Sequence, residues 1–95
     1  MKKYEMRGAG LYNAHNRKIA MAGGESIYDA GDRRIGTVLG DDLLDSDGRV
    51  MMTVRGLNIY DAGNIKVGVL SEVLESIRGV VKDNVRAALW YCFVR

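Results

Sequence analysis

The chain contains no proline, and this absence is the first constraint on its fold. Proline cannot donate to a sheet ladder, so a chain without it can pair along every strand. The same 95 residues hold 12 glycines, and glycine supplies the positive φ that tight turns require. This combination is typical of many short strands joined by tight turns, and it favours an all-β fold.

Cysteine and long apolar runs are also scarce, and both absences exclude classes of protein. The single Cys92 cannot form an internal disulfide, so we expect no disulfide framework. The first residues are basic but no apolar run follows them, so we expect no signal peptide. No stretch approaches the roughly 18 apolar residues of a membrane span. We therefore expect no membrane association and a cytoplasmic location.

A large excess of charge of one sign is missing as well. Fourteen basic residues face 12 acidic residues, which gives a net charge of +2. Nucleic-acid binding usually shows as a strongly basic balance, so nucleic acid is not the expected partner. The length fits a single domain, 1–95.

What the chain does contain is a repeat with a period of 16 residues. Its clearest copies start at 27 and 59, and both begin Ile-Tyr-Asp-Ala-Gly. Looser copies start at 11 and 43. The repeats cover 11–26, 27–42, 43–58 and 59–70. Sixteen residues are too few for a strand–helix–strand unit of about 30, but they suit a hairpin with its connection. The sequence therefore predicts an up-and-down meander of hairpins, either closed as a barrel or packed as two layers.

Small residues recur inside the longer strand of each repeat, at Ala20, Gly36 and Gly68. Glycine is unfavourable inside a strand unless another group approaches closely. An aromatic ring over a cross-strand glycine restores the lost packing. We therefore expect the repeated tyrosines to lie over these positions.

The period breaks after residue 70. Residues 71–78 have an N-cap type residue, Ser71, and apolar residues at helical spacing, which predicts a short helix, although Val73 and Leu74 could equally extend a strand. Residues 80–95 are interpreted as a degenerate fifth copy, with its turn at Asp83 and Asn84, that ends in an apolar strand.

Two rows of side chains are candidate binding residues. The tyrosine row could stack against a base or sugar, or it could be a packing ladder along the sheet. Arginines recur at one level of the repeat and could meet phosphates, although the nearby aspartates should neutralise most of that charge. The candidates are Tyr12, Tyr28, Tyr60, Arg17, Arg33 and Arg49.

The row Asn13, Asp29, Asp45 and Asp61 is the other candidate. Residues 45–48 resemble the opening of a calcium loop, but the later ligands of that loop are missing. The alternative is that these side chains cap their own turns or pair with basic residues across the hairpin. We expect no metal and no cofactor.

Catalytic constellations are missing too. His15 is the only histidine, and neither a Ser/His/Asp nor a Cys/His arrangement can be argued from the sequence. Cys92 is interpreted as a small buried apolar residue. We therefore expect that the protein is not an enzyme.

The repeated unit resembles the small bacterial proteins described as four-fold β-flower proteins. The resemblance covers about two-thirds of the chain, and it implies an all-β repeat domain without an assigned activity or catalytic residues. A second, local resemblance is to PRC-barrel domains, carried by 35–38 and 42–50. Those are small β-barrels that bind partner proteins or RNA-processing machinery.

These observations predict a non-enzymatic structural or protein-interaction module. Its partly apolar faces and apolar tail predict a homo-oligomer, most simply a dimer, and a further protein partner is left open. The alternative is a small-ligand or nucleic-acid binding β-domain that uses the tyrosine row and the basic level of the repeat.

Overall fold

Residues 3–95, the part of the chain that the computed structural model describes, form one ten-stranded sheet and a helical core. The strands are β1 (Tyr4–Arg7), β2 (Gly10–Tyr12), β3 (Lys18–Gly23), β4 (Ser26–Asp29), β5 (Arg34–Leu39), β6 (Asp42–Leu44), β7 (Val50–Arg55), β8 (Asn58–Asp61), β9 (Lys66–Val69) and β10 (Ile77–Arg78). The helices are α1 (Leu70–Ser76), α2 (Asp83–Leu89) and a π-helical continuation of α2, η1 (Trp90–Val94).

The sheet is the predicted up-and-down meander. Strands β1 to β9 lie in chain order, and each is antiparallel to the next. Strand β10 joins the free edge of β1 in parallel, with Tyr4 opposite Ile77. The sheet is not closed, because β9 and β10 are its two edges and are not hydrogen-bonded to each other. A closed barrel, one of the two predicted arrangements, is therefore not formed.

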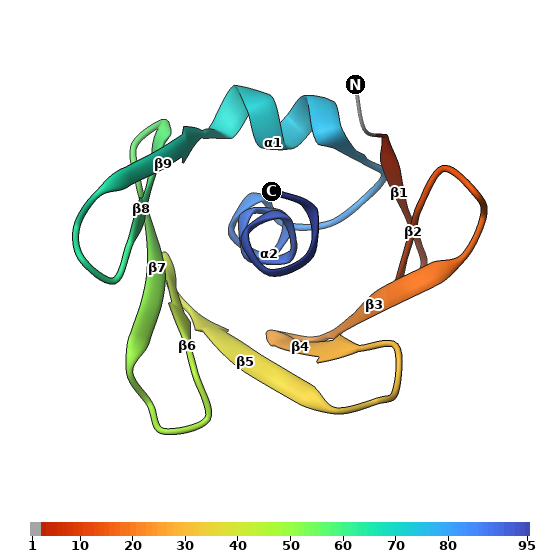
Figure 1. The fold of residues 1–95 in the computed structure, drawn as a ribbon, viewed down its shortest axis with the longest axis horizontal. Coiled ribbons are helices and arrows are strands. Elements are labelled where there is room, and N and C mark those ends of the chain that lie inside the picture. Colours follow the sequence, from red (N-terminus) through yellow and green to blue (C-terminus); the bar gives the residue numbers. More distant parts are fainter. Residues whose placement is uncertain (1–2) are drawn as a thin grey trace.

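The strands form a ring around α2, which Figure 1 shows end-on, and α1 occupies the arc between β9 and β1. The predicted short helix near 71–78 is thus confirmed as α1, which starts one residue earlier. Together α2 and η1 contain 12 residues, a length of about 18 Å at the rise of an α-helix. The shortest dimension of the molecule is also 18 Å, so the helix spans the ring from one side to the other.

The prediction for residues 80–95 was wrong. The expected turn at Asp83 and Asn84 is the first turn of α2, and the expected apolar strand is η1. The core explains this difference. The inward face of the sheet is apolar, and the helix offers it apolar side chains on most of its surface. The buried residues of this helix are Val85, Ala87, Ala88, Leu89, Trp90 and Val94.

The repeat is confirmed at the level of backbone pairing. Tyr28 lies opposite Arg34 and Tyr60 lies opposite Lys66, each next to a β-bulge at the same repeat position. Two positions of the 16-residue period also have positive φ. These are Asn16, Asp32, Gly48 and Asn64 at one position, and Gly8, Gly24, Gly40 and Gly56 at the other. Equivalent residues therefore have equivalent backbone surroundings.

At Gly36 and Gly68 the approaching groups are not the predicted tyrosines. A Cβ on Gly68 would lie 2.5 Å from Cη2 of Trp90, a residue of the central helix. A Cβ on Gly36 would lie 2.6 Å from the carbonyl oxygen of Leu44. The tyrosines lie one residue after the inward-facing positions, such as Ile27 before Tyr28, so they belong to the outer face. Gly68 instead makes room for the central helix, and Gly36 makes room for the neighbouring strand β6.

Alternating strand directions place the connections at two edges of the ring. One edge carries the tight glycine turns 7–10, 23–26, 39–42 and 55–58, and we call it the glycine-turn edge. The opposite edge carries the loops 13–17, 29–33, 45–49 and 61–65, and we call it the Asx-loop edge. Helix α2 begins at the glycine-turn edge, where Nδ2 of Asn84 donates to the carbonyl oxygen of Gly40 at 2.7 Å.

Candidate functional site

Each loop of the Asx-loop edge is organised by its first side chain. In every repeat one Oδ1 accepts hydrogen bonds from two backbone N–H groups, two and four residues later, at 2.8 to 3.0 Å. The accepting residues are Asn13, Asp29, Asp45 and Asp61. The turn-capping interpretation is therefore confirmed. Within residues 3–95, no group of three or more His, Cys, Asp or Glu side chains could hold a metal ion.

We expect Asp45→Ala to lower the free energy of unfolding by about 1–2 kcal/mol, because it removes the acceptor of two hydrogen bonds. Asp45→Asn keeps the Oδ1 acceptor, as Asn13 does in the first repeat, and should cost less than half as much. Urea denaturation followed by circular dichroism measures both values. Equal losses for the two variants would show that the charge matters and not the cap.

The tyrosine row lies on the outer face of the sheet, and two of its three rings are already covered. The guanidinium of Arg7 lies 4.6 Å from the ring centre of Tyr12. That of Arg55 lies 4.7 Å from the ring centre of Tyr60. All three rings are half-buried. A base or sugar would have to displace these arginines before it could stack on Tyr12 or Tyr60.

The predicted arginines are not the residues that lie over the tyrosine rings. Arg17, Arg33 and Arg49 are exposed in the Asx loops, whereas the cations over the rings come from Arg7 and Arg55. Within the part of the chain that the structure describes, the one ion pair is between Arg7 and Glu5, at 2.9 Å. The aspartates therefore accept backbone N–H groups and do not form ion pairs with the arginines of the same loop.

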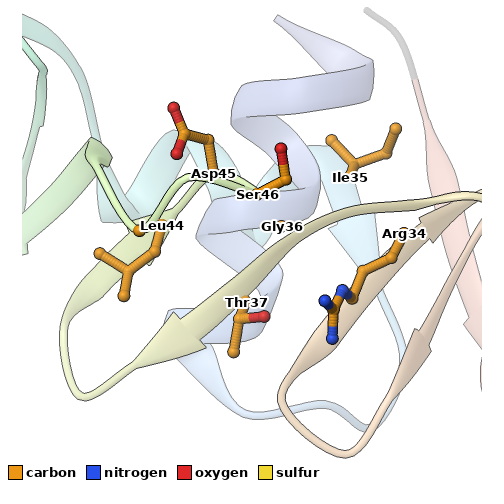
Figure 2. A pocket seen from close by; sticks show the side chains of 8 residues that line it. Arg34, Ile35, Gly36, Thr37, Leu44, Asp45 and Ser46 are labelled. Atoms are coloured by element: carbon orange, nitrogen blue, oxygen red, sulfur yellow. The ribbon is translucent and has the colours of Figure 1, made fainter.

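A shallow groove lies between β5 and the Asx loop that follows β6, with a volume of about 290 Å³. Figure 2 shows Arg34 and Thr37 on the strand and Asp45 and Ser46 on the loop. We call it the middle groove. It contains one cationic and one anionic side chain, so its formal charge is zero.

A second groove of about 270 Å³ occupies the matching place two repeats earlier, between β1 and the first Asx loop. We call it the seam groove, because β10 pairs with β1 beside it. Asn13 and Ala14 correspond to Asp45 and Ser46 of the middle groove. The residues that line the seam groove are Lys3, Tyr4, Glu5, Arg7, Asn13, Ala14 and Arg78. Sequence reasoning missed Lys3 and Arg78, because only the pairing of β1 with β10 brings them to one place.

An apolar depression of about 370 Å³ lies where the turn after β7 meets α1. Its apolar lining comes from Leu57, Val69, Leu70 and Leu74. Leu57 is 73% exposed, and the carbonyl oxygen of this residue accepts a hydrogen bond from the backbone of Leu70. The depression therefore opens at the glycine-turn edge.

Cys92 lies in η1 and is partly buried. Burial raises the pKa of its thiol to about 11, and the nearby charge of Arg95 offsets only part of that effect. The thiol is therefore protonated at neutral pH, and a protonated thiol is a poor nucleophile. His15 is exposed in the first Asx loop.

Among residues 3–95 no helix is long and apolar enough to cross a membrane. Comparison of the chain with protein-family models, with curated proteins and with solved structures gives no match.

Proposed function

We propose that this protein is a non-catalytic interaction module that self-associates through its glycine-turn edge. The observation that carries the proposal is the exposure of large apolar side chains at that edge. Leu39, Leu57 and Val80 are 65%, 73% and 97% exposed. Leu39 and Leu57 flank the glycines of their turns, and Val80 follows β10, which runs parallel to β1 towards the same edge.

The apolar depression extends this edge towards α1. Leu57 belongs to both, and Leu74 on α1 is 41% exposed. Contiguous exposed apolar surface on a small domain marks an interaction site. Burial of one leucine side chain contributes about 1.5–3 kcal/mol, and a second copy that covered the edge would bury several.

The test compares the two edges of the ring. We expect the protein to be a dimer, and we expect Leu57→Ser to raise the dimer dissociation constant at least about tenfold, since a tenfold change corresponds to about 1.4 kcal/mol. Ile65→Ser is the matched control, because Ile65 is 64% exposed on the Asx-loop edge. Sedimentation equilibrium measures all three proteins. A monomeric parent, or equal effects of the two variants, would contradict the proposal.

We also propose kinship with the four-fold β-flower repeat proteins, which the four equivalent hairpins support. The PRC-barrel resemblance has less support, because the 16-residue period accounts for the same residues. The alternative, ligand binding by the tyrosine row, also has less support, because Arg7 and Arg55 occupy two of the rings.

A further inference from the structure

We propose that the seam groove binds a small phosphate monoester through its phosphate group. This inference does not depend on the glycine-turn edge. It rests on the charge of the groove, on the amide of Asn13 and on the position of Arg78.

The charge of the seam groove differs from that of its repeat-equivalent. Lys3, Arg7 and Arg78 contribute three positive charges and Glu5 one negative charge, so the formal sum is 3 − 1 = +2. In the middle groove Arg34 and Asp45 give 1 − 1 = 0. The side chains that line these two equivalent grooves therefore sum to zero in one groove and to +2 in the other. The net charge of the whole chain is also only +2.

Asn13 is the second observation, and it points to an anion. Its Oδ1 accepts from the backbone N–H groups of His15 at 2.9 Å and Arg17 at 3.0 Å. These bonds fix the amide, so the Nδ2 group must be on the other side of the side chain. That group makes no hydrogen bond to another atom of residues 3–95. The other three repeats have a carboxylate oxygen there, which would repel an anion, whereas Asn13 offers two N–H donors.

Arg78 reaches the groove because β10 pairs in parallel with β1, with Arg78 opposite Glu5. Its side chain forms no ion pair in the described part of the chain and is exposed. Arg7 is held by Glu5 and by the ring of Tyr12. A planar guanidinium can bind two phosphate oxygens at once, and Lys3 adds a point charge. The basic residues form one groove and no extended track, so a single phosphate fits better than a nucleic-acid backbone.

The test is a titration of the full chain with glycerol phosphate, followed by amide NMR shifts. We expect saturable shifts at residues 3–14 and 77–79, with a dissociation constant of about 1 mM or below. Asn13→Asp should weaken binding about tenfold while the protein stays folded, because aspartate already caps the other three loops. Arg78→Ala should weaken it by a similar factor, because it removes a charge-assisted contact.

Asp45→Asn is the matched control, since it makes the same exchange in reverse in the middle groove and should leave binding unchanged. Leu57→Ser should also bind normally, which separates this proposal from the proposed self-association. Titrations with inorganic phosphate and with vesicles that contain phosphatidic acid distinguish a free phosphate ligand from a lipid headgroup. The proposal is overturned if shifts do not saturate, if Asn13→Asp binds like the parent, or if only the vesicles bind.

Discussion

Trp90→Ala is expected to lower the free energy of unfolding by about 3–5 kcal/mol, the usual cost of removing a buried aromatic side chain. Trp90 is 3% exposed, and its ring lies against the backbone of β9 at Gly68. The ring is the bulkiest group of the helix that fills the interior of the sheet. Circular dichroism during urea denaturation measures the loss, since the variant has no tryptophan to follow.

The contact with Gly68 can be isolated by a double-mutant cycle. Gly68→Ala should cost about 1–3 kcal/mol in the parent, because its Cβ would lie 2.5 Å from the Trp90 ring. In the Trp90→Ala background the ring is absent, and the cost should fall by at least about 1 kcal/mol, as for residues in contact.

Gly36→Ala is the control for this cycle, because its Cβ would meet the backbone of Leu44 and not the tryptophan. It should cost the same in both backgrounds. An unchanged cost of Gly68→Ala in the two backgrounds would show that the glycine serves the strand and not the helix.

Arg86→Ala should destabilise the protein by about 3 kcal/mol, because bonds from a charged donor contribute about 1.5–3 kcal/mol each and are not additive. The guanidinium donates to the carbonyl oxygens of Ile77 at 2.9 Å, Gly79 at 2.9 Å and Val81 at 3.2 Å. These bonds hold the segment that carries the chain from the ring to its centre.

Arg86→Lys is the conservative comparison, since one ammonium group cannot bind three carbonyls in the same planar arrangement. It should lose about half as much stability. Arg34→Ala removes an arginine that is exposed on β5, and surface changes of this kind stay within about 0.5 kcal/mol. Denaturation, with hydrogen exchange at 77–81, measures all three. If Arg86→Ala lost as little stability as Arg34→Ala, water would have to bind the three carbonyl oxygens in place of the guanidinium.

The hairpin repeat could be read from the chain because its determinants are local. A side chain such as Asp29 binds N–H groups two and four residues away, and Gly40 adopts a positive φ within its own turn. The period of 16 therefore predicts the turns, the strands and the role of the aspartate row.

The helical core could not be predicted in the same way. Residues 85–94 form a short apolar run, and periodicity alone does not separate a buried strand from a buried helix. Ala87, Ala88 and Leu89 are good helix formers, and this was the signal that could have favoured a helix. The seam groove was equally hidden, because Arg78 is more than 60 residues away from Asn13 in the sequence.

By itself the sequence determined the hairpins, since each Asx loop is capped within five residues of its own chain. Only the tertiary structure decided what fills the ring and which charges share a groove. A curled sheet has an apolar interior that needs a helix with apolar side chains on most of its surface, and that demand exists only once ten strands have assembled. The pairing of β10 with β1 was also decided by the tertiary structure, because it depends on where α1 brings the chain back to the start of the sheet.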